Sequence, residues 1–360
     1  MWFKNRFFKI STTLIAILII IFLIGKIDFF IGPFYKFVLI VSFPLFVSGF
    51  IYYLLRPFVR MLKKIKFPST LAILSVYVIS IGLLTLFTMY TSSVIGQQIQ
   101  AFIKDWPRLS LSVFGFINDL KLYETFGAFG LQFSQQITSS VQNLLPLIYN
   151  GIISAFSTIA GIAAVFLIVP FIVFFMLKDD AMFVSKLRCR TPENYRKEIN
   201  EIIHETDKTL STYIIGQAII ALIVGILMYI GFLIIGLNYA AFLALFVLIT
   251  AFIPILGAIV GVIPAIFVAL SSPDPYLIIK ILILTLIVQQ IVGNLIFPNL
   301  VGRQLNIHPL TIIIIFIGAF TLFGFLGVLI IIPVYAVIKI LVSGAFKMYK
   351  IWKDNAKAVS

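Results

Sequence analysis

The chain has 360 residues, of which 61% are hydrophobic and only 11% are charged, and its mean hydropathy is +1.14. Soluble domains carry about 25% charged residues, so this composition excludes a soluble protein and predicts an integral membrane protein in contact with the lipid bilayer. The formal net charge of +14 would suit nucleic acid, but the basic residues lie beside apolar runs, and we expect no nucleic-acid partner.

The apolar runs lack the alternation of outer-membrane barrel strands, which predicts an all-α polytopic membrane protein. Six runs are long enough for full spans, at about 20 residues each. They cover residues 10–25 with their flank, 38–55, 69–92, 151–177, 213–235 and 276–298. No small-residue cleavage site follows the basic start, so residues 1–93 are predicted to form an uncleaved N-terminal segment of three spans, followed later by a fourth span at 151–177.

Two segments between the spans are predicted to be helical. Residues 94–150 have no net charge and apolar residues at helical spacing, so we expect a small external helical subdomain, a hairpin with a break at Trp106 and Pro107. Residues 178–208 contain Thr191 and then Pro192, a typical helix start. The helix has one apolar face, made by Tyr195, Ile199, Ile202, Ile203 and Leu210. Its acids balance its bases, so we expect this amphipathic segment to pack against its own protein rather than on lipid.

The positive-inside rule sets the predicted orientation. Most of the 27 Lys and Arg residues lie at the N-terminus, after the second span, in 178–208 and near the C-terminus. These segments share one side if the spans alternate, so both termini, including a basic tail at 346–360, are predicted to be cytoplasmic.

Residues 240–270 are too long for one straight span, at about 46 Å against a hydrocarbon core near 30 Å. Their middle contains Pro254, Gly257, Gly261 and Pro264. Each proline removes a helix hydrogen bond, which predicts a broken helix whose free backbone groups lie in protein or a wet cavity. The alternative is a kinked span in which the two glycines form a helix-packing face.

Residues 309–341 repeat this pattern, with Gly324 and Gly327 at the middle and Pro333 after them. Residues 209–345 are therefore predicted to be a transport core of two repeats, each a span followed by a broken element. If both broken elements are re-entrant hairpins, which we favour, the repeats are inverted and Arg303 lies inside; if both cross fully, Arg303 lies outside.

The core motifs resemble the autoinducer-2 exporter family of bacterial membrane proteins. The resemblance rests on Phe252–Gly257 with Pro264, on Gln290–Gly302 with His308 and Pro309, and on Phe323–Gly327 with Pro333. It implies a multispan carrier of the inner membrane, homo-oligomeric, that exports the quorum-sensing signal autoinducer-2 or, in some members, exchanges sodium for protons. Many members have an acidic residue where Val292 stands here, which leaves ion coupling at that position open.

Enzymatic chemistry has little support in the sequence. There is no GxxxxGK[ST] phosphate loop, and the run from His204 to Lys208 is not HExxH. We expect no enzyme activity, no cofactor and no metal site.

The candidate residues therefore belong to a solute pathway and its gates. Gln290 and Asn294 are four residues apart and share one helix face, which in lipid should turn inward. The pathway candidates are Pro254, Gly257, Gly261, Gln290, Asn294, Pro298, Gly324 and Gly327. The gate or coupling candidates are Arg303, His308, Glu205 and Asp207.

We predict a secondary transporter that exports a small polar solute, with autoinducer-2 as the candidate that the resemblance implies. A cation is an alternative cargo, and a sodium/proton antiporter of the same family is the alternative mechanism. From another class, the alternatives are a cell-envelope scaffold that binds a partner through residues 94–150, and a passive channel.

Overall fold

The computed structural model describes residues 11–15, 18–19, 28–119, 127–136, 138–143, 146, 149–150, 163–180, 189, 191–254, 256–274, 276–300 and 308–359. Every element of regular structure in this part of the chain is a helix, and five helices in it are long and apolar enough to cross a membrane. The predicted all-α polytopic fold is confirmed. Most of the first predicted span and the start of the fourth lie outside the described residues.

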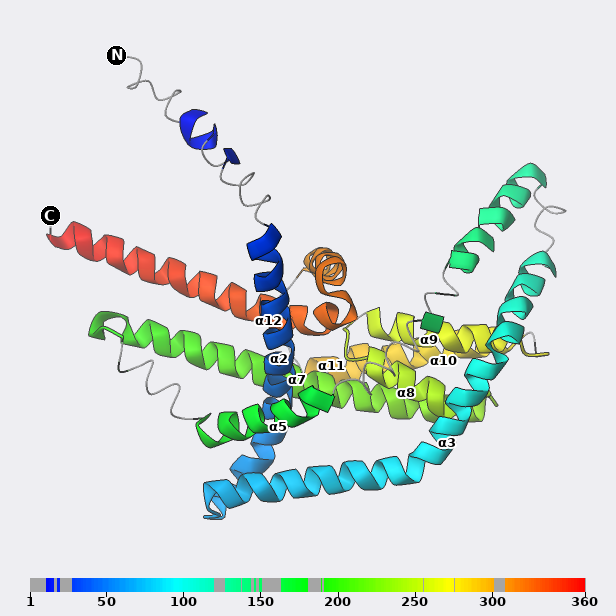
Figure 1. Cartoon of the computed structure of the whole chain (residues 1–360), viewed down its shortest axis with the longest axis horizontal. Coiled ribbons are helices and arrows are strands. Elements are labelled where there is room, and N and C mark those ends of the chain that lie inside the picture. Colours follow the sequence, from blue (N-terminus) through cyan, green and yellow to red (C-terminus); the bar gives the residue numbers. More distant parts are fainter. Residues whose placement is uncertain are drawn as a thin grey trace.

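Helix α2 runs from Asp28 to Lys64 and helix α3 from Ser69 to Asp119. The third predicted span and the start of the external segment are thus one continuous helix, which changes direction along its length (Figure 1). The predicted break at Trp106 and Pro107 is wrong, because Pro107 lies inside α3. Phe102, Leu109 and Val113 on either side of it are buried, so packing against neighbouring helices offsets the hydrogen bond that the proline cannot donate.

Helix α5, from Ala163 to Lys178, packs on α2 through an apolar cluster that includes Val59, Ile73 and Val173. After a short 3-10 turn, η2 (Glu193–Tyr195), helix α7 runs without interruption from Arg196 to Ile234. The amphipathic segment and the fifth predicted span therefore form one rod of 39 residues.

Gly236 reverses the chain after α7. It has φ +70, its N–H donates to the carbonyl of Leu233, and the N–H of Leu237 donates to the carbonyl of Phe232. This is the Schellman ending that favours glycine, because a side chain is strained at that φ. The turn directs the chain back along α7.

The first predicted broken element is a helical hairpin of α8 (Ala240–Thr250) and α9 (Leu256–Leu270). At 11 and 15 residues, the two helices measure about 16 and 22 Å, too short to cross a 30 Å hydrocarbon core singly. They pack antiparallel, since a Cβ built on Gly257 would meet Thr250 and one on Gly261 would meet Val247. The predicted break is confirmed, and it takes the folded-back form.

The chain then enters α10 (Leu277–Ile291), which continues into a π-helical turn, η3 (Val292–Ile296), and a short α11 (Phe297–Leu300). The last helix, α12, extends from Pro309 to Val359. The prediction that residues 309–341 contain a second break is wrong for the backbone, because α12 is helical throughout. The helix instead changes direction: its orange start lies along the line of sight in Figure 1, while its red remainder lies across the page.

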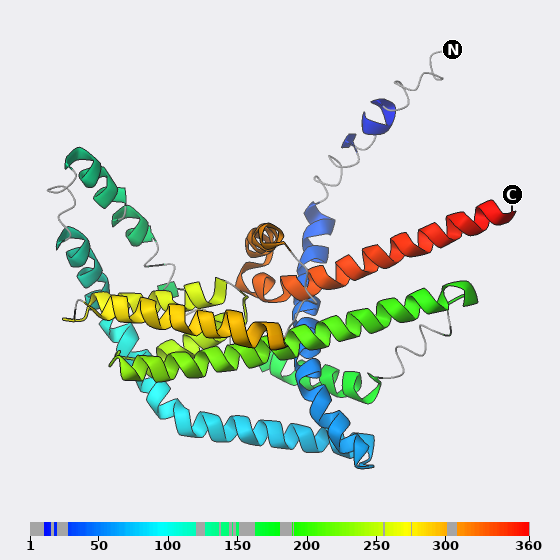
Figure 2. The same cartoon turned by 180° about the vertical axis from the view of Figure 1, so that it is seen from behind.

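Most of the buried core lies between α7, α8, α9 and α10. Close approach between these helices uses glycine: a Cβ on Gly225 would lie 2.7 Å from Leu248, and one on Gly231 would lie 2.3 Å from Leu284. The first half of α7 and the second half of α12 run side by side to the same end of the molecule in both views (Figures 1 and 2). Ile202 of α7 fills the space above Gly344 of α12, which confirms that the amphipathic segment packs against its own protein.

Candidate functional site

The tip of the α8–α9 hairpin contains the non-helical residues that follow Thr250. Pro254 has no N–H to donate to the Thr250 carbonyl four residues earlier, and that carbonyl instead accepts a hydrogen bond of 2.8 Å from the N–H of Ile253. The helix resumes when the N–H of Gly257 donates to the carbonyl of Ile253 at 2.9 Å. The tip is thus a compact turn with backbone groups outside any helix ladder.

Gln217 of α7 holds this tip. Its amide Nε2 donates to the carbonyl of Ala251 at 2.7 Å, and only 3% of its surface is exposed. Ala251 is buried as well, so an unpaired carbonyl here would cost about 1–3 kcal/mol. A single amide inside an otherwise apolar span therefore ties α7 to the broken helix.

Glycines let the second helix of the hairpin return close to the first. A Cβ on Gly257 would lie 2.0 Å from the carbonyl oxygen of Thr250, and a Cβ on Gly261 would lie 2.5 Å from the Thr250 hydroxyl. These are backbone and buried side-chain contacts that have little room to move, so any larger residue at 257 must open the hairpin. The two glycines do form a packing face, as the alternative interpretation expects, but they form it within the hairpin.

Apolar side chains from three other helices surround the tip. Ile253 is buried against Tyr213, Phe316 and Ile332, and the ring of Phe252 meets that of Phe50 edge-on at 5.7 Å. Helices α2, α7 and α12 therefore converge on the tip, which places it at a junction of the fold.

A network of charged side chains lies next to this junction. Arg56 of α2 donates from Nη1 to Asp207 at 2.6 Å and from Nη2 to Asp180 at 2.8 Å. Tyr52 donates to Asp180 at 2.5 Å and Tyr53 donates to Asp207 at 3.2 Å. Arg56 is buried, a position that a guanidinium can hold only with such partners.

Asp180 accepts most of these bonds. Burial of its carboxyl raises the pKa, but the hydrogen bonds from the tyrosine and from both Arg56 and Arg60 outweigh burial and hold the pKa below its ordinary value. Asp180 is therefore ionised at neutral pH, which keeps the charges of the network balanced.

The π-helical turn η3 lies at the centre of the motif between α10 and α12. The N–H of Phe297 donates to the carbonyl of Val292, five residues earlier, and Pro298 has no N–H to donate to the preceding turn. The side chain of Asn299 donates to the carbonyl of Leu295 at 2.7 Å. π-Helical turns occur often at functional sites, and neither period nor composition had predicted this one.

Gln290 and Asn294 share one face, as predicted, and Asn294 donates to Gln290 at 2.6 Å. Both are exposed and Pro298 beside them is exposed too, so the expectation that the amides turn inward is wrong for this chain on its own. Val292 is buried. The structure does not bring the amide pair together with the hairpin tip.

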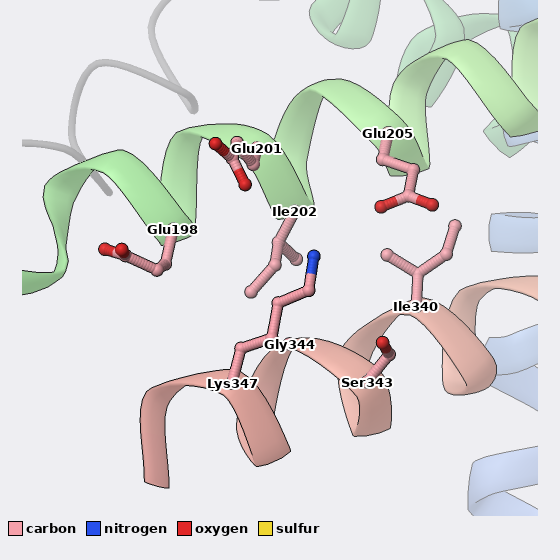
Figure 3. A pocket seen from close by; sticks show the side chains of 8 residues that line it. All are labelled: Glu198, Glu201, Ile202, Glu205, Ile340, Ser343, Gly344 and Lys347. Carbon is pink, nitrogen blue, oxygen red and sulfur yellow. The ribbon is translucent and has the colours of Figure 1, made fainter. Parts of the chain in front are cut away.

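The other candidate residues are scattered. His308 is exposed and accepts a hydrogen bond from the N–H of Leu310, Arg303 lies outside the described residues, and Gly324 and Gly327 lie within α12, where Gly327 is buried. Glu205 lines a small cleft between α7 and α12. Figure 3 shows Lys347 reaching from α12 towards α7 in this cleft; its lining residues are Glu198, Glu201, Ile202, Glu205, Ile340, Ser343, Gly344 and Lys347.

The open end of the hairpin is fastened to α3. The hydroxyl of Tyr239 donates to the carboxylate of Asp105, and the N–H of Phe242, in the first turn of α8, donates to the side chain of Gln98 at 3.0 Å. The first described part of the external segment thus binds the helix that leads to the tip. Within the described residues, no three His, Cys, Asp or Glu side chains gather as ligands for a metal ion.

Comparisons with known proteins place the chain in a family of transporters. The model of the AI-2E family transporter matches residues 13–346. YueF of Bacillus subtilis (strain 168), provisionally named a transport protein, is 35% identical over 98% of this chain and 99% of its own length. PerM of Escherichia coli (strain K12), provisionally named a permease, is 30% identical over 94% of each chain.

Proposed function

Because the chain belongs to the AI-2E transporter family, a family of multipass membrane transporters, we propose that it is a secondary transporter that exports a small polar solute, and that autoinducer-2 is the first solute to test. The observation that carries this proposal is the α8–α9 hairpin. Its tip presents backbone groups outside a helix ladder next to the buried amide of Gln217. Discontinuous helices of this kind form solute and ion sites in secondary transporters.

The chemistry of the hairpin favours a neutral, hydroxyl-rich solute. The groups at the tip are carbonyls, amides and the Thr250 hydroxyl, which exchange hydrogen bonds with hydroxyl groups without a charge. The proposed pathway passes the hairpin tip beside Gly257 and Gly261, and access to it alternates between the two sides of the membrane.

Counterflow in proteoliposomes tests the proposal. Vesicles loaded with unlabelled solute should take up the labelled form faster than empty liposomes, and a panel that includes autoinducer-2 should contain at least one such solute. No counterflow of any solute, with counterflow intact for an unrelated carrier in the same lipid, would contradict the carrier and favour the scaffold. Sodium-driven proton movement without solute flux would favour the antiporter.

The predicted topology has its own test. In a Cys189→Ser background, Ser271→Cys should react with an impermeant thiol reagent from outside the cell, because the hairpin returns to that side. Asn306→Cys should react only from the cytoplasm, and the reverse pattern would refute the inverted arrangement of the two repeats.

A further inference from the structure

Arg56 binds two aspartates that come from different parts of the fold. Asp180 follows α5, whereas Asp207 belongs to α7. The side chain of Arg56 is 10% exposed, that of Asp180 is 21% exposed and that of Asp207 is 38% exposed. The guanidinium therefore bridges a half-buried carboxylate on one side and a more open one on the other.

The two carboxylates are held very differently. Asp180 accepts hydrogen bonds from Tyr52, from Nε and Nη2 of Arg56, and from Arg60 at 3.0 Å. Among the described residues, Asp207 accepts one bond from Arg56 and one from Tyr53. If α7 moves away from α2, the Asp207 bonds are the ones that break, and Arg56 keeps its Asp180 partner, so no buried charge is left alone.

This network lies between the hairpin tip and the end of α7 that is predicted to be cytoplasmic. Gln217, which binds the tip, is ten residues beyond Asp207 on α7, about 15 Å along the helix. The apolar side chains around Ile253 fill the space near the tip, and Tyr53 joins the two layers: its ring packs on that apolar cluster and its hydroxyl binds Asp207. An apolar layer and then an ionic layer thus lie between the hairpin tip and the predicted cytoplasmic end of α7.

We propose that the ion pair between Arg56 and Asp207 is the cytoplasmic gate of the pathway, with Asp207 as its releasable half. The inference rests on the proposed transport function, because a gate needs a pathway to close. Helices α2 and α5 form one unit, joined by their apolar cluster and by Asp180. Helix α7 belongs with the hairpin through Gln217, so opening the gate is a separation of these two units at Asp207.

The test measures access to the hairpin tip from the cytoplasmic side. Ile253→Cys in a Cys189→Ser background is reconstituted, and its rate of reaction with an impermeant thiol reagent is measured from that side. Ile253 is buried, so the reaction should be slow. Asp207→Asn removes the charge-assisted bond and should raise the rate about tenfold, whereas Asp207→Glu keeps the carboxylate and should leave the rate near its starting value.

Asp274→Asn is the matched control. Asp274 pairs with Lys280 at 2.7 Å, so this variant removes an ion pair of similar length beyond the other end of the hairpin, and the rate should not change. If Asp207→Asn fails to fold, Tyr53→Phe removes only the hydroxyl bond to Asp207, keeps the ring in place, and should raise the rate about threefold.

An unchanged rate in folded Asp207→Asn, or an equal rise in Asp274→Asn, would overturn the gate. The labelling needs no transported solute, so a failure of the gate is distinguishable from a failure of the transport proposal. Counterflow in the parent protein with unchanged labelling in Asp207→Asn would refute the gate alone.

Discussion

The α8–α9 hairpin and helix α12 have related sequences and different backbones. Both contain a Phe, a Leu-Gly pair and a later proline, yet the chain leaves the helix only in the hairpin. In the hairpin a proline, Pro254, lies at the break, whereas no proline lies between Pro309 and Pro333 of α12. A proline inside a helix costs about 3 kcal/mol and a glycine about 1 kcal/mol, so the middle of α12, which has glycines and no proline, stays helical where the hairpin breaks.

A second difference is what holds each element. The hairpin tip depends on partners distant in the sequence, Gln217 above all. Thr321 of α12 instead donates to Ile317 within its own helix. The turn of the hairpin therefore depends on a hydrogen bond from a neighbouring helix, whereas α12 continues through its middle as a helix.

The largest expected effect is that of Gly257→Leu. The new side chain cannot fit beside the Thr250 carbonyl, so the hairpin must open and counterflow should fall to the level of empty liposomes. Gly318→Leu, in α12, adds the same volume where no group apart from its own turns of helix backbone lies within 4 Å of the new Cβ, and it should leave counterflow unchanged. Normal counterflow in Gly257→Leu would show that the hairpin is not part of the pathway.

A smaller effect is expected for Gln217→Leu, measured as the melting temperature in detergent. Loss of the amide leaves the buried Ala251 carbonyl unpaired, and a membrane hydrogen bond of this kind contributes about 1 kcal/mol. Thr321→Val removes a bond within α12 and should leave the melting temperature unchanged. Equal effects of the two substitutions would mean that both elements depend on tertiary bonds to the same degree.

The smallest effect concerns Asp180, in the network next to the hairpin tip. Its pKa is lowered in the folded protein, so its contribution to stability is complete above the unfolded pKa of about 3.9 and is lost as the pH falls through the lower folded value. The melting temperature of the parent protein should fall more steeply below about pH 4 than that of Asp180→Asn. If the melting temperatures of the two proteins fall equally steeply with pH, the network adds no pH-dependent stability.

Asp274→Asn is the comparison for that measurement. The pKa of the Asp274 carboxyl is also lowered, by the hydrogen bonds from Lys280 and from the backbone N–H of Tyr276. The pair of Asp274 and Lys280 is exposed, however, beyond the open end of the hairpin. Solvent screens exposed ion pairs, so the melting temperature of Asp274→Asn should fall with pH as steeply as that of the parent protein.

The sequence predicted the parts of the fold that depend on local chemistry. Long apolar runs indicated the helical spans, and Pro254 with the glycines after it indicated the broken helix. The long continuous helices were less predictable: tertiary packing carries α3 through Pro107, and α7 continues without a break from its amphipathic half into its apolar half.

The candidate site was less predictable because its contacts join distant residues. Arg56 and Asp180 are 124 positions apart, and in the sequence each resembles an ordinary flanking charge. Gln217 carried one usable signal, a lone amide within an apolar span. Asp207 was identified as a gate candidate from its place before the fifth span, but its partner could not be.

The continuity of α7 has a mechanical consequence. Its 39 residues make a stiff rod about 58 Å long, fixed to α12 at Ile202, to α2 at Asp207 and to the hairpin tip at Gln217. A tilt of about 5° around Gln217, which lies close to the midpoint, displaces the two ends by about 2–3 Å and Asp207, about 15 Å away, by about 1.3 Å. Helix α7 is thus a lever that pivots near the hairpin tip, so a small force on its amphipathic arm would move Asp207 away from Arg56 while Gln217 stays next to the Ala251 carbonyl.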